Sequence, residues 1–173
     1  MSHPNVGRIL HSLDLTVKEE NENFVLPVIV MERYDITLNN FIITARPSVD
    51  ERLYIVQKMI CGIDYIHSQH IIHYDLKPEN IMITTRNKHL HLYIVDFGLA
   101  KRSTDPYTKF HHKSGTPPWM APEIFRGEGH DFPADLFALA HLATAVMVCA
   151  VECQDADCKL CKQLSLWAGQ SFT

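Results

Sequence analysis

The 173-residue sequence lacks an excess of positive charge. Sixteen Lys and Arg stand against twenty Asp and Glu, which gives a formal net charge of −4 at pH 7. Such a chain has no broad basic face to offer to nucleic acid or to an anionic membrane, so binding to either is not expected. With 46% hydrophobic and 21% charged residues, the composition is typical of one folded globular domain.

Signals for secretion or for membrane insertion are also scarce. The first five residues contain no cationic segment followed by an apolar run, which predicts an intracellular, cytoplasmic protein. The most apolar run, residues 136–151, is shorter than the about 18 residues that a membrane-spanning helix needs. It also contains His141. This run therefore predicts a buried helix.

Cysteine is scarce in the first three quarters of the chain, and four of the five cysteines lie in the last quarter. A reducing compartment disfavours a disulfide framework. The spacing C-x3-C-x4-C-x2-C only loosely resembles a zinc-binding pattern, which leaves structural zinc and ordinary reduced thiols as alternatives. The four residues concerned are Cys149, Cys153, Cys158 and Cys161.

Hydrophobic patterning predicts both strands and helices. Apolar residues within 9–15 and 24–31 indicate two strands of a hairpin, joined by a charged turn. Further short strands are expected at 71–72, 81–83 and 90–95, with a turn at 86–88 between the last two. No internal repeat or Gly/Ser-rich linker interrupts this series of elements.

The clearest helix begins at Ser48, which forms a capping-box spacing with Glu51. Apolar residues then recur at helical spacing to about Gln69, and Gly62 among them predicts close packing. The expected buried face consists of Val49, Leu53, Val56, Ile60, Ile63 and Ile66.

One stretch is far more specific than the rest, His73-Tyr74-Asp75-Leu76-Lys77-Pro78-Glu79-Asn80. Asp96-Phe97-Gly98 follows it, and Ala121-Pro122-Glu123 comes next. In this order the three segments resemble the signature of the eukaryotic protein kinases, in its Ser/Thr form. The resemblance implies an α+β, partial protein-kinase fold, with remnant small-lobe strands followed by a mainly helical large lobe. It covers residues 1–148 and leaves residues 149–173 as a Cys-rich tail of unclear structure.

The resemblance also implies a reaction, the ATP-dependent phosphorylation of a protein substrate on serine or threonine, with magnesium as cofactor. Asp75 corresponds to the catalytic carboxylate that orients the substrate hydroxyl and accepts its proton. Lys77 corresponds to the lysine that meets the transferred phosphate. Asn80 and Asp96 correspond to the magnesium ligands, which suits a cation that prefers oxygen donors.

Further positions carry implied roles in binding and structure. Met31 corresponds to the gatekeeper beside the nucleotide, and the backbone groups of Glu32 and Tyr34 would bind the adenine edge. Thr116 and Trp119 correspond to the substrate-docking segment. Structural roles are implied for His73, Phe97, Gly98, Glu123 and Asp135, and Asp135 would accept hydrogen bonds from backbone N–H groups of the catalytic loop.

The sequence departs from the family in two respects. Tyr74 stands where the family has an arginine that pairs with a phosphorylated activation segment, so switching by that route is expected to be lost. The sequence also has no counterpart of the Gly-rich loop, the strand lysine, the glutamate helix or the last helices of the large lobe.

These absences lead to two expectations. Activity of the chain is expected to be weak or absent, and a non-catalytic kinase-like scaffold or a truncated gene product is the alternative. Exposed apolar surface around residues 9–15 and 136–151 is expected to favour self-association or a partner that completes the fold.

Overall fold

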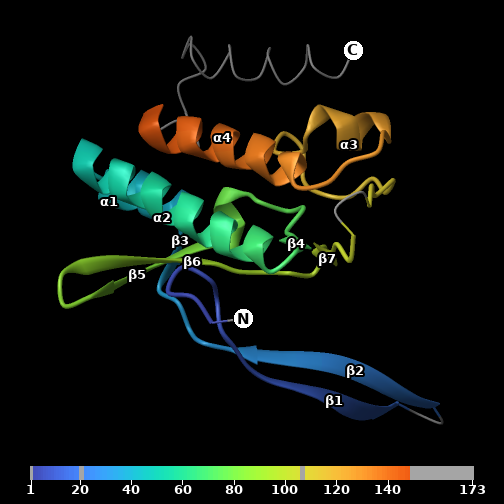
Figure 1. Cartoon of the computed structure of the whole chain (residues 1–173). Helices are drawn as coiled ribbons and strands as arrows, with labels where there is room; N and C mark the ends of the chain where they lie inside the picture. Colours follow the sequence, from blue (N-terminus) through green and yellow to red (C-terminus); the bar gives the residue numbers. More distant parts are fainter. Residues whose placement is uncertain (1, 20–21, 106–107, 149–173) are drawn as a thin grey trace.

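A computed structural model describes residues 2–19, 22–105 and 108–148 (Figure 1). Helices α2 and α4 pack against each other on one side of the small sheet that contains β5 and β6, and the β1–β2 hairpin extends away from this body. The strands are β1 (Ile9–Glu19), β2 (Glu22–Met31), β3 (Ile36–Thr37), β4 (Ile71–Ile72), β5 (Ile81–Arg86), β6 (His89–Ile94) and β7 (Lys101–Arg102). The helices are α1 (Leu38–Ala45), α2 (Val49–Ser68), α3 (Pro122–Arg126) and α4 (Pro133–Val148), with a 3-10 turn at Pro78–Asn80.

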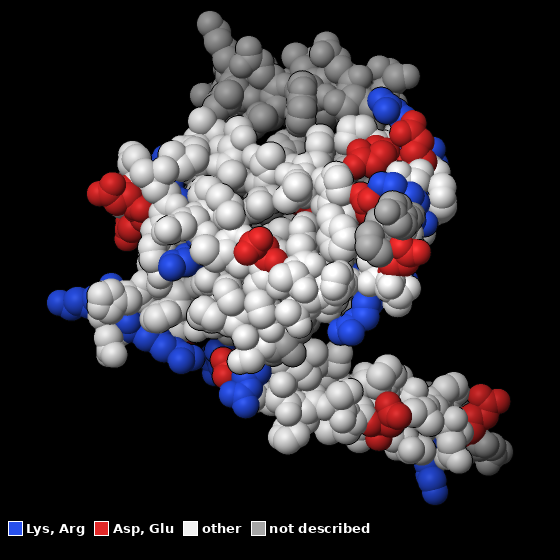
Figure 2. All heavy atoms as spheres, viewed as in Figure 1, with Lys and Arg blue, Asp and Glu red and all other residues white. Residues whose placement is uncertain are grey.

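The predicted hairpin is confirmed as the antiparallel pair of β1 and β2. Because paired residues share a face, the register places a continuous apolar set on one side of the hairpin. We call it the apolar hairpin face; it consists of Leu13, Leu15, Val17, Phe24, Leu26 and Val28. Leu15 is 49% exposed and Leu26 51% exposed, and most of the hairpin surface visible in Figure 2 is uncharged. The expected exposed apolar surface is therefore present on these strands.

Helix α2 begins as the capping box predicts. The backbone N–H of Ser48 donates to Glu51 Oε2 at 2.8 Å, and the backbone N–H of Glu51 donates to Ser48 Oγ at 3.3 Å. The helix ends at Ser68, with Gln69 as its C-cap. Two orphan donors of the first turn are thereby satisfied, which fixes the start of the helix beneath the site.

The expected buried face of α2 was partly wrong. Val49, Leu53 and Ile60 are each at least half exposed, whereas Ile55 and Met59 are completely buried. The apolar residues of this helix are spread around more of its circumference than its neighbouring elements cover. Its neighbours β4, β6 and α4 cover only the side that carries Ile55, Met59, Gly62, Ile63 and Ile66.

Gly62 lies where α2 packs tightly against β6, which confirms the close packing expected at this glycine. A Cβ atom at Gly62 would lie 2.6 Å from Ile94 Cδ1 and 3.0 Å from the carbonyl oxygen of Asn5. Asn5 belongs to the N-terminal segment that runs beside β6, where its carbonyl accepts a hydrogen bond from Ile94 N–H at 2.9 Å. Any side chain at position 62 would force these three segments apart.

Two small sheets position the loops that carry the kinase-like motifs. One has the strand order β3-β5-β6, and the other pairs β4 with β7. The turn between β5 and β6 lies at Asn87 and Lys88, both with positive φ, which confirms the turn expected at 86–88. The loop between β4 and β5 and the segment after β6 therefore extend from neighbouring strands.

Helix α4 confirms the helix expected in the apolar run, although it is not buried on all sides. Ala138, Leu142 and Val146 are buried, whereas Leu136 is 51% exposed. Within residues 2–19, 22–105 and 108–148, no helix is long and apolar enough to span a membrane. The predicted alternatives for the cysteine tail, zinc or reduced thiols, fall outside the described residues.

Candidate active site

Asp135 of α4 holds the loop after β4 in place through hydrogen bonds to its backbone. This aspartate is 1% exposed, and its carboxylate accepts hydrogen bonds from the backbone N–H groups of His73 at 2.7 Å and Tyr74 at 2.9 Å. His67 Nε2 lies 2.9 Å from the same carboxylate. Tyr74 has φ +63, a left-handed conformation that costs a residue with a Cβ about 1–2 kcal/mol. The bonds to Asp135 hold the loop in this conformation.

The His73 side chain also holds the loop in place. Its Nε2 lies 3.0 Å from the carbonyl oxygen of Val95, and its Nδ1 accepts a hydrogen bond from Asp75 N–H at 3.3 Å. Because a carbonyl only accepts, Nε2 carries the ring proton. Burial lowers the pKa of His73 despite the nearby charges of Asp135 and Asp75, which keeps the ring neutral near pH 7. The ring also packs against Phe97, with 5.0 Å between centroids.

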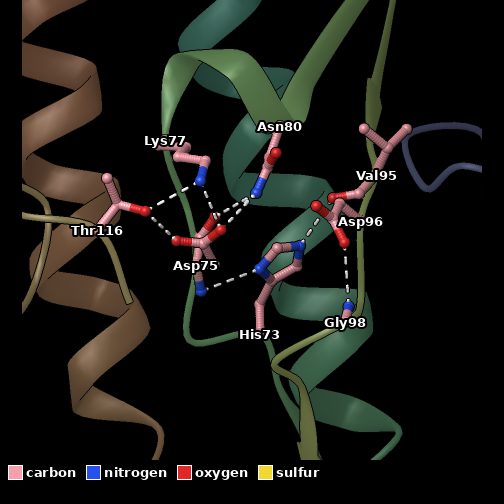
Figure 3. Close-up of polar contacts among 8 residues, drawn as sticks. All are labelled: His73, Asp75, Lys77, Asn80, Val95, Asp96, Gly98 and Thr116. Carbon is pink, nitrogen blue, oxygen red and sulfur yellow. Dashed lines mark hydrogen bonds and ion pairs between the residues drawn. The ribbon is translucent and has the colours of Figure 1, made fainter. Parts of the chain in front are cut away.

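Asp75 stands at the centre of a polar network (Figure 3). Thr116 Oγ1 donates to Asp75 Oδ1 at 2.7 Å, and Lys77 Nζ lies 2.8 Å from Asp75 Oδ2. Asn80 Nδ2 donates to both the carbonyl oxygen and Oδ2 of Asp75, at 2.8 and 3.0 Å. Burial raises the pKa of Asp75, but the bonds from Lys77, Thr116 and Asn80 outweigh it and hold this pKa below its usual value. The carboxylate is therefore ionised near pH 7.

Thr116 reaches Asp75 from a distant part of the chain because the segment before it lies against the catalytic loop. Gly115 has φ +126, and a Cβ atom there would lie 2.9 Å from the carbonyl oxygen of Tyr74. Only glycine fits both conditions. Lys77 Nζ donates to Thr116 Oγ1 at 2.9 Å, which closes a triangle with Asp75.

Asn80 and Asp96 are the two residues that the family resemblance implies as magnesium ligands. The backbone carbonyl of Asn80 accepts a hydrogen bond from Val95 N–H at 2.9 Å, which holds it beside the residue that precedes Asp96. Asp96 has φ +64, is exposed and accepts a hydrogen bond from Gly98 N–H at 3.1 Å. Among the described residues no group of three or more His, Cys, Asp or Glu forms a complete metal site. One carboxylate and one amide oxygen nevertheless fit magnesium, which takes its other ligands from water and phosphate.

The segment expected to bind adenine follows β2. Met31 ends the strand and is 42% exposed, and Glu32 N–H donates to the carbonyl oxygen of Arg8 at 3.4 Å. Tyr34 Oη accepts a hydrogen bond from Arg8 N–H at 3.2 Å, and its ring packs on Tyr93 of β6. The segment is therefore attached both to the N-terminal residues and to the strand that leads to Asp96.

Trp119 and Glu123, two further residues with implied roles, are both partly buried. Trp119 is partly buried and packs against the main core, with its ring 5.1 Å from that of His141. Glu123 lies in the first turn of α3 and, among the residues described, its carboxylate forms no salt bridge. Because Glu123 is partly exposed, water can solvate its charge.

Sequence reasoning treated Tyr74 only as a lost arginine and missed the contacts that its side chain makes. Its hydroxyl lies 3.0 Å from His130 Nδ1, and its ring makes edge-to-face contacts with Phe110, His112 and His130. We call these four residues the Tyr74 cluster. Local spacing carries no signal for it, because its members are 36 to 56 positions from Tyr74 and meet only in the fold.

Comparison with known proteins places this geometry in a family. Residues 1–164 match the family model described as the protein kinase domain, so the chain belongs to the protein kinase family. Over 135 residues it is 32% identical to death-associated protein kinase 2 of Homo sapiens, which covers 76% of this chain and 36% of that protein. Over 87 residues it is 39% identical to rhodopsin kinase GRK1 of Homo sapiens, which covers 50% of this chain and 15% of that protein.

A solved structure agrees in fold. A chain in the crystal structure of the yeast RNA Pol II CTD kinase CTDK-1 complex aligns with a TM-score of 0.68 at 22% identity, over 84% of this chain and 45% of that chain. The present chain thus has a partial protein-kinase fold. It spans about a third or less of the two relatives named above.

Proposed function

We propose that this chain carries the phosphate-transfer centre of an ATP-dependent protein Ser/Thr kinase. The observation that supports this most strongly is the network in which Thr116, Lys77 and Asn80 all contact the carboxylate of Asp75 within 3.0 Å. The Thr116 hydroxyl is itself an alcohol held 2.7 Å from Asp75 Oδ1. A serine or threonine hydroxyl of a substrate would need the same kind of contact with this carboxylate.

In the proposed reaction, Asp75 accepts the proton of the substrate hydroxyl as that oxygen bonds to the γ-phosphorus of ATP. The bond from this phosphorus to the β–γ bridging oxygen breaks, and ADP leaves. The pKa of Asp75 is held below its usual value, so the carboxylate is ready to accept a hydrogen bond from the alcohol. Its main contribution is orientation, because this reaction depends chiefly on positioning and charge neutralisation. Lys77 places a positive charge beside the same carboxylate for the transferred phosphoryl group.

Asn80 and Asp96 would hold magnesium, which when bound neutralises charge on the nucleotide phosphates. Asn80 commits its Nδ2 to Asp75, so its Oδ1 is the atom left for the metal. Met31, Glu32 and Tyr34 are proposed for the adenine, and Thr116 with Trp119 for docking of the protein substrate. The use of ATP favours an intracellular, cytoplasmic setting.

The second candidate is a non-catalytic kinase-like scaffold. One observation favours it. The apolar hairpin face is exposed, which suits a binding surface.

Phosphate transfer with purified chain separates the two candidates. Labelled ATP is incubated with Mg²⁺ and with peptides that carry serine, threonine or tyrosine as the only acceptor. The kinase proposal expects slow, Mg²⁺-dependent labelling of the serine and threonine peptides, which Asp96→Asn abolishes. Asp64→Asn, the same chemical change at an exposed position of α2, serves as the control. Labelling that is indistinguishable between wild type and Asp96→Asn would instead support the scaffold.

A further inference from the structure

Tyr74 lies between His73 and Asp75, two residues that several hydrogen bonds hold in place. Its N–H is bound by Asp135, and its neighbours His73 and Asp75 are hydrogen-bonded to each other. The side chain is 95% buried and packs with Ala121, Ile124 and Ala134 in a second apolar cluster. A tyrosine at this place therefore extends from the loop that carries Asp75 into the segment that follows β7.

The hydroxyl of Tyr74 meets a histidine that is itself fixed on two sides. His130 exchanges backbone hydrogen bonds with Phe110, at 2.9 and 3.0 Å, and its Nε2 lies 2.9 Å from the carbonyl oxygen of His112. Because this carbonyl only accepts, the contact selects the tautomer with its proton on Nε2, in which Nδ1 is an acceptor. Tyr74 O–H is then the donor. Burial raises the pKa of Tyr74, which keeps its hydroxyl protonated for this role.

These contacts join the loop to the segment that carries Thr116. Phe110 and His112 lie a few residues before Thr116, and the backbone at Gly115 lies so close to the Tyr74 carbonyl that it leaves no room for a Cβ atom. Thr116 in turn contacts Asp75 and Lys77. The Tyr74 side chain and the Tyr74 backbone thus contact the same segment at two points, Phe110 with His112 and Gly115.

We propose that the Tyr74 cluster is a phosphate-independent clamp, in which Tyr74 and His130 act as positioning residues that keep the 108–116 segment docked and Thr116 in contact with Asp75. An arginine at position 74 would need an anion as partner. The cluster instead joins neutral rings through one hydrogen bond and edge-to-face contacts, which require no added charge. Only the catalytic consequence of the clamp rests on the proposed function.

The test removes one oxygen atom. Tyr74→Phe keeps the ring contacts and deletes the hydrogen bond to His130. The control is Tyr54→Phe on α2, away from the site, which deletes a hydroxyl that donates to the Leu90 carbonyl at 3.0 Å. Amide hydrogen exchange of residues 108–116 and the ¹⁵N shifts of the His130 ring are measured on the full chain without ATP or substrate. We expect Tyr74→Phe to speed exchange of this segment about 3–10-fold and to move the Nδ1 shift, with Tyr54→Phe changing neither.

Because this readout needs no turnover, a chain that transfers no phosphate can still show the clamp, so the two proposals can fail separately. His130→Ala provides a second variant from the other side of the bond and should loosen the same residues. Exchange in 108–116 that is equal in Tyr74→Phe, His130→Ala and Tyr54→Phe would overturn the proposal. So would a large gain in protection that appears only when Thr104, Thr108 or Ser114 is phosphorylated.

Discussion

Replacing Asp135 by asparagine tests, with almost no change in side-chain shape, whether its hydrogen bonds stabilise the loop that carries Asp75. The carboxylate is 1% exposed and accepts bonds at 2.7 Å from His73 N–H and 2.9 Å from Tyr74 N–H, with His67 Nε2 also at 2.9 Å. An asparagine keeps one acceptor oxygen but turns an NH₂ group toward at least one of these N–H donors. The variant therefore leaves a buried backbone N–H without a partner.

The size of the effect follows from these bonds. A buried donor left without a partner costs about 1–3 kcal/mol, and the lost charge assistance of the remaining bonds adds to that cost. Asparagine is easier to bury than a carboxylate, which limits the sum. We expect a loss of about 2–4 kcal/mol in the free energy of unfolding, or roughly 5–15 °C in Tm for a chain of this size.

Urea and thermal unfolding followed by circular dichroism measure this loss. Asp64→Asn makes the same chemical change on the exposed side of α2 and should leave the free energy of unfolding within about 0.5 kcal/mol of wild type. Equal stability of Asp135→Asn and Asp64→Asn would refute the idea that Asp135 holds the catalytic loop.

Three further predictions concern pH, association and phosphorylation. Burial lowers the pKa of His73, His112 and His141. The unfolded chain therefore binds more protons than the folded chain below about pH 6.5, so the free energy of unfolding is greatest above that pH and falls as the pH decreases. His73→Asn should reduce the dependence of this free energy on pH by up to about 1.4 kcal/mol per pH unit, measured by urea titrations. Sedimentation should show concentration-dependent self-association that Leu15→Glu on the apolar hairpin face weakens and Thr16→Glu on the other face does not; a wild-type monomer at high concentration contradicts this. Phosphomimetic changes at Thr104, Thr108 or Ser114 should leave the nucleotide affinity, measured by calorimetry, unchanged in the wild-type chain. In the Tyr74→Arg variant the same changes should alter this affinity. A large effect of the phosphomimetic changes with Tyr74 in place would refute the expectation that switching by phosphorylation is lost.

Local chemistry made some elements of this fold predictable. The Ser48 capping box determined where α2 begins, and the positive-φ turn at Asn87 was expected from its polar residues. The two apolar runs predicted the hairpin, whereas its register appears only in the structure. The side of α2 that is buried could not be predicted, because Val49 and Ile55 are equally apolar and only the positions of β6 and α4 decide between them.

The candidate site shows the same division. Asp75, Lys77 and Asn80 were grouped because their eight-residue motif resembles the kinase catalytic loop, and Thr116 was added by the same resemblance. The contact of Tyr74 with His130 was missed, since it joins residues 56 positions apart whose meeting depends on the path of the whole 108–130 segment. A short polar motif is local, whereas a cluster of buried rings is a property of packing.

The single-turnover rate of phosphate transfer from ATP to a serine peptide, compared between wild type and Asp75→Asn, tests the central claim most directly. We predict a wild-type rate below the about 1–100 s⁻¹ that is ordinary for kinases, because the sequence has no Gly-rich loop to hold the phosphates. Asp75→Asn should lower this rate by about 10²–10⁴-fold. Equal rates for the two proteins would contradict the role of Asp75, and a wild-type rate within the ordinary range would contradict the expectation of weak activity.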